Sequence, residues 1–244
     1  NGAFGAANQS SKTYASWTFR KAPGFFDVVT YAGNSTARTI PHSLGSVPGM
    51  IIVRAYDATN NWYVWHNGIS AVNNEFLQLN ASNGTQDTGG DEWNSTEPTS
   101  TNFSVGTDGN VNLTGRNYIA YIFAHDDQSF GTNSNEAIIK CGGVTTGSDE
   151  YATVNLGFEP QFVMFKRTDV SGDWLMLDTM RGWNLGNDDQ RLYANLTNAE
   201  STTSSGHGEV NSTGFRIYNL GGSADLIYIA IRRPHKPPEA GTDV

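Results

Sequence analysis

The chain contains two copies of one sequence pattern, and this repeat constrains its fold more than any other feature. His42–Arg54 (HSLGSVPGMIIVR) matches Val154–Lys166 (VNLGFEPQFVMFK), which lies 112 positions later. The same spacing relates further short segments, namely Asn61-Trp62 to Asp173-Trp174, Trp65 to Leu177, and Ser100–Phe103 to Ser212–Phe215. A constant spacing over a stretch of this length indicates two tandem units of one architecture.

The last apolar segment of each copy sets the outer limits of the repeats. Tyr118–Ile122 resembles Tyr228–Ile231 with a spacing of 110. We therefore predict five parts: an N-terminal linker or anchor segment (1–25), repeat 1 (26–127), a linker (128–135), repeat 2 (136–233) and a Pro-rich C-terminal linker (234–244). Low-complexity and Pro-rich end segments are typical of modular or fibrous proteins, so we expect flanking modules.

Each copy predicts short strands joined by turns. The shared Leu-Gly-x-x-Pro motif is a turn, because glycine accepts positive φ and proline fixes φ. Met50–Val53 and Phe162–Phe165 follow it as unbroken apolar strands, a pattern that indicates burial on both faces. Gly, Asn, Thr and Ser supply 95 of the 244 residues, which suits tight turns better than helices. The sequence predicts an all-β protein with two tandem repeated antiparallel β-sandwich-like domains.

One segment fits either a helix or a strand. Its apolar residues have the spacing of one helix face: Ile69, Val72, Phe76 and Leu79. We favour a strand over Phe76–Leu79, because Leu192–Asn195 resembles it in repeat 2.

Charge and composition exclude several classes of function. The formal net charge is −9 and the 15 Lys and Arg residues are scattered, so we expect no nucleic-acid partner, because phosphate binding needs a basic surface. No apolar stretch is long enough to cross a bilayer, so we expect no membrane insertion. The single cysteine, Cys141, has no partner for an internal disulfide, and we expect it in the core.

The sequence carries no recognisable catalytic motif. The serine-hydrolase elbow, the paired histidines of zinc proteases and the phosphate-binding glycine loop are missing, so we expect no enzyme, no cofactor and no metal. Acidic pairs occur in polar turns, where we interpret them as solvated surface: Asp91-Glu92, Asp126-Asp127 and Asp188-Asp189. Asp87, Asp91 and Glu92 are an alternative calcium site without regular ligand spacing. His125 and His235 end equivalent strands, which indicates a scaffold boundary rather than a general base.

The tryptophans occupy two kinds of position. Trp62 and Trp174 match each other, and Trp65 matches an apolar residue, so we predict that these three lie in the core. Trp93 and Trp183 have no counterpart and lie in the loops that differ most between the copies, where function is commonly located. They are the candidate ligand-binding residues. The competing interpretation is a loop tryptophan folded onto its own domain, or a subunit contact.

The N-terminal segment is also rich in aromatic residues. Trp17, Phe19, Phe25 and Phe26 lie within ten positions of one another. We expect them to anchor this segment on a repeat or on a neighbouring subunit.

Four segments carry a family resemblance: Tyr14–Tyr31, Leu44–Val53, Tyr118–His125 and Tyr228–Arg233. They resemble a duplicated β module of uncharacterised proteins from marine tailed bacteriophages, and the run Ser16–Pro23 is the most specific part. In that group the module often lies beside LamG-type, concanavalin-like domains in tail-fibre or other virion appendage proteins. The resemblance extends over nearly the whole chain. It implies a structural role in the virion and supplies no catalytic residues.

Three hypotheses follow. The first is a non-enzymatic bacteriophage virion structural protein, an appendage or tail-fibre module that contributes to attachment to host-surface glycans. Its partners would be other virion proteins, further copies of itself in a homotrimer, and a host glycan, and its location would be the virion. The second is a carbohydrate-binding module of an extracellular protein, which the unmatched Trp93 and Trp183 motivate. The third, a polysaccharide-degrading enzyme, rests only on the acidic pairs.

Overall fold

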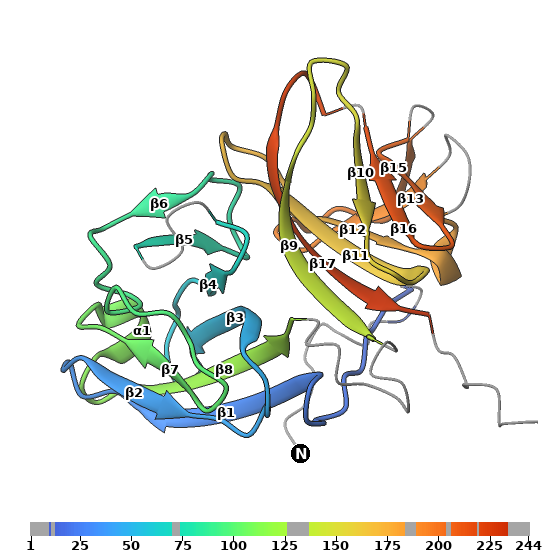
Figure 1. Cartoon of the computed structure of the whole chain (residues 1–244). Coiled ribbons are helices and arrows are strands. Elements are labelled where there is room, and N and C mark those ends of the chain that lie inside the picture. The colour runs from blue at the N-terminus through green and yellow to red at the C-terminus, as the bar shows by residue number, and fades with distance from the viewer. Residues whose placement is uncertain are drawn as a thin grey trace, which may run out of the picture.

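The computed structural model of the protein describes residues 10, 13–69, 74–125, 137–183, 189–203, 206–218 and 220–233. Repeat 1 contains a six-stranded antiparallel sheet and a two-stranded one (Figure 1). The large sheet has the order β1 (Phe26–Ala32), β8 (Asn117–Ala124), β3 (Pro48–Ala55), β4 (Tyr63–His66), β5 (Glu75–Gln78) and β6 (Gln86–Asp87). The small sheet pairs β2 (Arg38–Pro41) with β7 (Asn102–Val105), and one helical turn, α1 (Gly109–Asn112), precedes β8.

Repeat 2 is built in the same way. Its six-stranded sheet has the order β9 (Ile139–Thr145), β17 (Asp225–Arg232), β11 (Pro160–Arg167), β12 (Leu175–Asp178), β13 (Asp189–Tyr193) and β14 (Ser201–Thr203). Its small sheet contains β10 (Ala152–Asn155), β16 (Gly214–Ile217) and β15 (Gly208–Asn211), and the 3₁₀ turn η2 (Thr179–Arg181) follows β12.

The strand orders of the two large sheets correspond one to one, although the small sheet has two strands in repeat 1 and three in repeat 2. This confirms the predicted fold class: an all-β protein with two antiparallel sandwich-like halves. Even an irregularity is repeated, because the pairing shifts between Pro48 and Met50 in repeat 1 and between Pro160 and Phe162 in repeat 2. The predicted strand at Phe76–Leu79 is also confirmed as β5, although Val72 of the alternative helix lies outside the described residues.

The strands described in repeat 1 lie between residues 26 and 124, and those in repeat 2 between 139 and 232. The predicted linkers at 128–135 and 234–244 lie outside the described residues, as do residues 1–9, 11 and 12 of the N-terminal segment. Within the described part of the chain, no helix is long and apolar enough to span a membrane.

The predicted correspondence of the last strands is wrong by two residues. Met50 pairs with Phe123, and its counterpart Phe162 pairs with Ile231, so the spacing between β8 and β17 is 108 rather than 110. A shift of two leaves every side chain on the same face of the sheet. The alternating apolar pattern therefore fits both alignments equally well, and only the pairing distinguishes them.

The unbroken apolar strand β3 is buried on both faces, as predicted: Met50, Ile51 and Val53 are fully buried and Ile52 nearly so. Alternate residues serve different cores. Met50 and Ile52 point toward repeat 2, where they line an apolar cavity of about 170 Å³ together with Phe162 and Met164, their own counterparts on β11. The two large sheets therefore pack on each other through equivalent positions.

The other face of each large sheet packs on the small sheet of its own repeat. In repeat 2, Val163 and Phe165 share a core with Val154 on β10 and Phe215 on β16. The edge-on aromatic pair of Tyr31 and Phe103 joins the corresponding layers in repeat 1. Apolar burial in these three interfaces is the main source of stability in a chain without disulfides.

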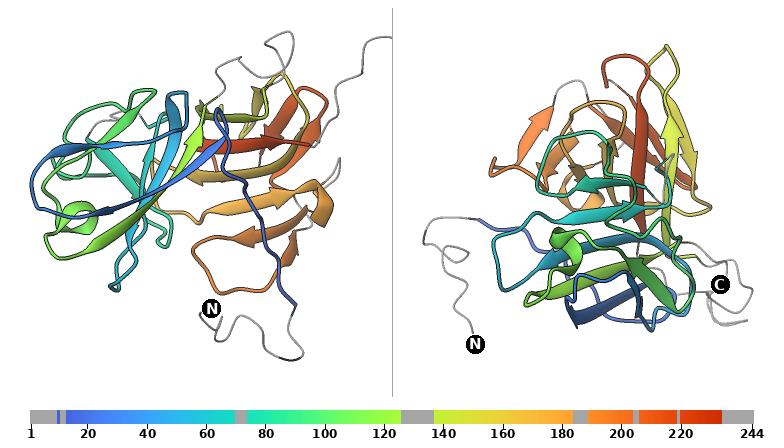
Figure 2. Two further views of the ribbon diagram at one scale, coloured as in Figure 1. Left: turned by 90° about the horizontal axis from the view of Figure 1, so that it is seen from below. Right: turned by 90° about the vertical axis from the view of Figure 1, so that its left-hand side faces the viewer.

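The N-terminal segment crosses the junction between the halves, as the dark blue trace in Figure 2 shows. The Trp17 ring packs on Phe162 of repeat 2, and its Nε1 donates a hydrogen bond to Asp178 Oδ2 at 2.8 Å. The Phe19 ring meets Phe123 of repeat 1 edge-on, with ring centroids 5.5 Å apart. The predicted aromatic anchor therefore contacts both repeats.

Candidate functional site

A pocket of about 230 Å³ lies at one end of the large sheet of repeat 1. Its polar lining comes from three places in the chain: Trp65 on β4 with Asn67 just after it, Glu97 in the loop before β7, and His125 just after β8. Val47, Pro48 and Pro98 form apolar walls. Ligand sites commonly have this character, with apolar walls and a few convergent polar groups.

Local strand pairing brings these residues together. Trp65 is opposite Ile51 on β3, and the Asn67 N–H donates a hydrogen bond to the Gly49 carbonyl at 3.0 Å. The His125 N–H donates to the Val47 carbonyl at 3.4 Å, just before the shift in pairing of β3. The pocket therefore sits where β3 begins, β4 ends and β8 ends.

Three side chains that line the pocket each have one polar atom that is buried from solvent and has no hydrogen-bond partner among the described residues: Trp65 Nε1, Asn67 Oδ1 and His125 Nδ1. The Trp65 side chain is only 3% exposed. Leaving one buried polar group unpaired costs about 1–3 kcal/mol, and most such groups in folded proteins have partners. Because all three atoms are buried from solvent, they do not themselves mark the pocket as a ligand site.

The neighbouring His66 is fixed by its own hydrogen bonds. Its Nδ1 accepts from the Gly68 N–H at 3.0 Å, so its Nε2 carries the hydrogen and donates to the Tyr228 carbonyl of repeat 2 at 3.1 Å. Burial lowers the pKa of His66 to about 3. A neutral histidine therefore ties the end of β4 to repeat 2 and adds no charge beside the pocket.

The same corner of repeat 2 has different residues. Leu177 occupies the position of Trp65 and Thr179 that of Asn67. Arg233 stands where His125 stands in repeat 1, and its N–H donates to the Glu159 carbonyl just as His125 donates to Val47. An ion pair between Arg233 Nη1 and Glu159 Oε1, 3.2 Å apart, spans this corner. The polar set of the pocket therefore belongs to repeat 1.

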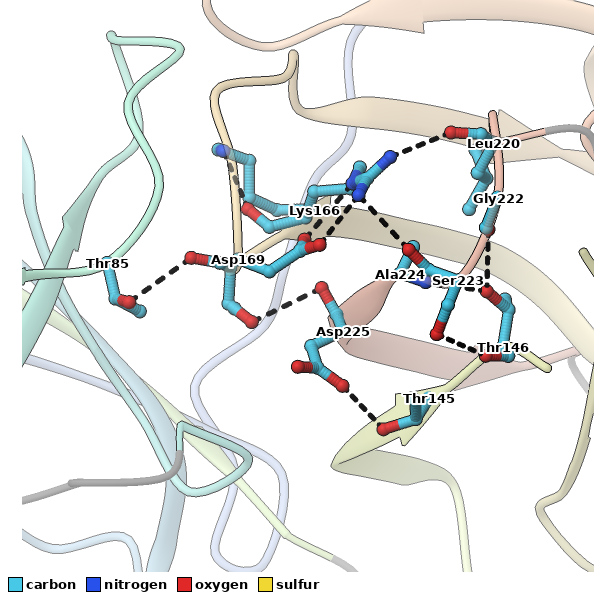
Figure 3. A network of polar contacts seen from close by, with 12 residues as sticks. Thr85, Thr145, Thr146, Lys166, Asp169, Leu220, Gly222, Ser223, Ala224 and Asp225 are labelled. Atoms are coloured by element: carbon cyan, nitrogen blue, oxygen red, sulfur yellow. Dashed lines mark hydrogen bonds and ion pairs between the residues drawn. The ribbon is translucent and has the colours of Figure 1, made fainter. Parts of the chain in front are cut away.

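A second polar cluster lies between the repeats (Figure 3). Thr85 donates from its N–H and its hydroxyl to the Thr168 carbonyl, at 2.9 and 3.1 Å. The Thr168 N–H donates to the Asp225 carbonyl, and the Thr145 hydroxyl donates to Asp225 Oδ1 at 2.6 Å. Because these groups are already paired within the chain, the cluster is a brace between the halves rather than a ligand site.

Lys166 belongs to the same brace and is completely buried. Its Nζ donates to the Ser82 carbonyl of repeat 1 at 3.2 Å and to the Arg167 carbonyl at 2.7 Å. Burial lowers the pKa of Lys166 to about 8, which the nearby Asp173 and Asp169 only partly oppose. The Arg167 guanidinium pairs with Asp169 beside it.

Trp93 and Trp183 do not form a binding surface in this structure. Each is 1% exposed, so neither presents a ring face to a ligand. Trp183 Nε1 donates to the Gly208 carbonyl at 3.0 Å, and its ring meets Phe215 in the core of repeat 2. The competing interpretation, a loop tryptophan folded onto its own domain, fits both residues. The polar sequence neighbours of a loop tryptophan do not show whether its ring faces solvent or the core.

Two of the three tryptophans that were predicted to lie in the core are buried, and one is not. Trp65 and Trp174 are buried, but Trp62 is only half-buried, so its core assignment is wrong. The Trp62 ring stacks on Tyr121, and the Arg54 guanidinium lies over it, 4.6 Å from the ring centroid. The two repeats differ at equivalent positions, with Trp65 in repeat 1 and Leu177 in repeat 2. This difference is the sequence feature that could have pointed to the pocket.

The acidic pairs are less exposed than predicted. Glu92 is 1% exposed and accepts a hydrogen bond from the Thr88 hydroxyl, while Asp189 is fully buried and accepts from the His207 and Gly208 N–H groups. Burial raises the pKa of both carboxyls. Asp91 is exposed, and Asp126, Asp127 and Asp188 lie outside the described residues.

Within the described ranges, no three His, Cys, Asp or Glu side chains are grouped closely enough to hold a metal ion, so the alternative calcium site at Asp87, Asp91 and Glu92 is not supported. Cys141 is fully buried, as predicted, and burial raises the pKa of its thiol. His125 lies after the end of β8, whereas His235 lies outside the described residues.

Comparisons with known proteins give one family. A family model described as "Domain of unknown function (DUF7483)" matches residues 1–231. No curated protein matches the chain. A solved structure titled "Crystal Structure of the STIV MCP" aligns with a TM-score of 0.20 and 8% identity, over 84% of this chain and 85% of that chain.

Proposed function

We propose that this chain, which belongs to the DUF7483 family, is a non-catalytic structural module of a bacteriophage virion appendage or tail fibre. The resemblance of Tyr14–Tyr31 and the repeat motifs to a duplicated module of tailed-phage proteins motivates the role. The observation that carries it is the way the two copies form one body: equivalent faces of the two large sheets are buried against each other.

This construction suits a structural part. The N-terminal segment bridges both halves, and direct hydrogen bonds join them at several points, including Trp174 Nε1 to the Gln78 carbonyl at 2.9 Å and the Gly172 N–H to the Ser82 carbonyl at 2.7 Å. The buried titratable groups Lys166, Glu92 and Asp189 all have hydrogen-bond partners within the chain. Side chains committed to internal contacts support a scaffold rather than catalysis.

Proteins of purified phage particles provide the test. Mass spectrometry of particles whose genome encodes this chain is expected to detect it in the virion, and antibody labelling in electron micrographs is expected to place it on an appendage. Its absence from purified particles would refute the proposal. Purified chain can also be measured by light scattering, where a homotrimer is the expected self-associated form.

A second candidate function, attachment to a glycan, is favoured by the pocket of repeat 1. Its lining combines apolar walls with the polar side chains of Asn67, Glu97 and His125, a combination common in ligand sites. In a virion appendage, such a site would contact the host surface. A glycan array probed with the purified chain tests this role, and uniform absence of binding would contradict it.

A further inference from the structure

The cavity between the two large sheets has an entirely apolar lining, and we propose that it binds one compact apolar molecule of the size of a benzene ring. The ligand lies beside the N-terminal segment and contacts both repeats. This inference goes beyond the functions proposed above. It concerns a different place from the pocket of repeat 1 and does not depend on the chain being a virion component.

The chemistry of the lining defines the class of ligand. All the surface that the lining residues expose in the cavity is apolar, and the volume is about 170 Å³. A buried water needs about two to four polar partners, whereas apolar cavities of about 150 Å³ in folded proteins take up benzene or xenon. The indole N–H of Trp17 is already used, because it donates to Asp178 Oδ2. A polar group in the cavity would therefore lose its hydrogen bonds to water without gaining a partner.

The lining can be reached from outside the molecule. Trp17 and Phe19 are half-buried, and they line both the cavity and an open groove of about 470 Å³ on the adjoining surface. Leu79, Met176 and Ala194 in the lining are also partly exposed. Residues 13–21, which include Trp17 and Phe19, form no strand. A ligand therefore enters past an irregular segment and breaks no sheet pairing.

Three of the four methionines in the chain line this cavity: Met50, Met164 and Met176. Met164 and Met176 are directly opposite each other on β11 and β12 of repeat 2, and Met50 comes from β3 of repeat 1. The methionine side chain is flexible and polarisable, makes favourable contacts with aromatic rings, and is common at surfaces that bind varied apolar partners. Its concentration here favours an aromatic ligand.

A difference between the repeats contributes to the space. Leu79 and Ala194 hold equivalent positions, because their N–H groups donate to the carbonyls of Trp62 and Trp174 at 2.9 and 3.1 Å. Both residues line the cavity. Repeat 2 therefore has only a methyl group where repeat 1 has the longer leucine side chain. A leucine at position 194 would occupy part of the cavity, which supplies a decisive variant.

NMR of the whole chain with isotope-labelled methionine methyl groups tests the proposal, and benzene is the probe. We expect the signals of Met50, Met164 and Met176 to shift when millimolar benzene is added. Met180 is 78% exposed and lies outside the lining, so its signal is the internal control and should not move. Replacing each methionine in turn by leucine assigns the four signals.

Hydroquinone provides the matched polar probe. It has the same ring with a hydroxyl group at each end, so at least one hydroxyl would lie in the apolar cavity. We expect it to bind at least about tenfold more weakly than benzene, because a buried hydroxyl without a partner is costly. This comparison uses the parent chain and needs no variant.

Two reciprocal variants change the space itself. Ala194→Leu introduces the residue that repeat 1 has at Leu79 and is expected to weaken benzene binding at least about tenfold, because the added side chain takes the place of the ligand. Leu79→Ala enlarges the cavity. It should raise the affinity for naphthalene relative to benzene, a gain that misfolding cannot produce.

The proposal is overturned if millimolar benzene leaves the three lining methionines unshifted, or if Met180 shifts as much as they do. It is also overturned if hydroquinone binds as tightly as benzene, or if a folded Ala194→Leu chain binds benzene as tightly as the parent. Should Ala194→Leu not fold, Leu79→Ala decides in its place, and an unchanged preference between naphthalene and benzene overturns the proposal. Detection of the chain in virions would be unaffected by any of these results.

Discussion

The two repeats share their framework and differ at one corner. Both have the same strand order and the same shift in pairing at the start of the central strand, β3 or β11. At the corner beside that shift, repeat 1 has a pocket lined by Trp65, Asn67 and His125, whereas repeat 2 has Leu177, Thr179 and the Arg233–Glu159 ion pair. Shared positions specify strand pairing, and unshared positions change which side chains line one corner.

The interface between the repeats shows a second difference. Met50 and Ile52 meet their counterparts Phe162 and Met164, so the contact is approximately symmetric. Trp174 breaks that symmetry, because its indole reaches across to the Gln78 carbonyl, while Trp62 at the same position in repeat 1 remains half-buried. The two equivalent tryptophans therefore contribute differently to the interface between the repeats.

The largest effect should come from removing this cross-repeat tryptophan. Trp174→Ala is expected to lower the free energy of unfolding by about 3–5 kcal/mol, because it empties a buried site and removes a hydrogen bond between repeats. Trp62→Ala is the matched control and should cost clearly less. Denaturant unfolding measures both. Equal losses would mean that the two positions contribute alike and that the interface is symmetric in energy.

A smaller loss is expected at Gly49, where β3 of repeat 1 lies close to Cys141 of repeat 2. A Cβ on Gly49 would lie 2.6 Å from Cys141 Cβ and 3.0 Å from His125 Cβ. Gly49→Ala should therefore destabilise the chain by about 1–3 kcal/mol through overpacking. The equivalent residue in repeat 2 is Gln161, which already carries a side chain. Denaturant unfolding measures this loss; Gln161→Ala should be nearly neutral in the same experiment, and a loss as large as that of Gly49→Ala would contradict this account.

Lys166 and its counterpart Arg54 predict a pH dependence specific to repeat 2. The Arg54 guanidinium lies over the Trp62 ring, whereas Lys166 is buried and its pKa is lowered to about 8 from an unfolded value of 10.5. Between these two values the unfolded chain holds more protons, so stability rises with pH, by at most about 1.4 kcal/mol per pH unit. Stability curves of the parent and Lys166→Met, taken from pH 7 to 10.5, measure the difference. Parallel curves would mean that Lys166 does not titrate in this window.

The sequence predicted the parts of the fold that depend on local pattern and on the repeat. The apolar strands Met50–Val53 and Phe162–Phe165, the hairpins after them and the sandwich-like halves are all present. The pairing of β8 could not be fixed, because a shift of two residues preserves the alternation of faces. The sequence predicts Glu92 and Asp189 to be solvated, yet both are buried, because a polar turn does not reveal which of its side chains folds inward.

The candidate site was harder to predict than the fold. Trp65, Glu97 and His125 are far apart in the sequence and meet only because β4, the loop before β7 and the end of β8 converge at one corner. Trp93 and Trp183 drew attention because they lack counterparts, yet both are buried. The informative difference was a mismatch within the aligned framework, Trp65 against Leu177, rather than an unmatched loop.

The smallest effect concerns the ion pair that spans the corner of repeat 2. Arg233 and Glu159 have side chains that are 63% and 41% exposed, and exposed pairs contribute about 0–1 kcal/mol because solvent and salt screen them. Glu159→Val introduces the residue that repeat 1 has at Val47, and we expect it to lower the free energy of unfolding by less than about 1 kcal/mol. Denaturant unfolding at low and high salt measures this change, and the difference should shrink as salt is added. A loss above about 2 kcal/mol would mean that the ion pair holds the end of β17 in place, so that the two corners differ in stability as well as in the side chains that line them.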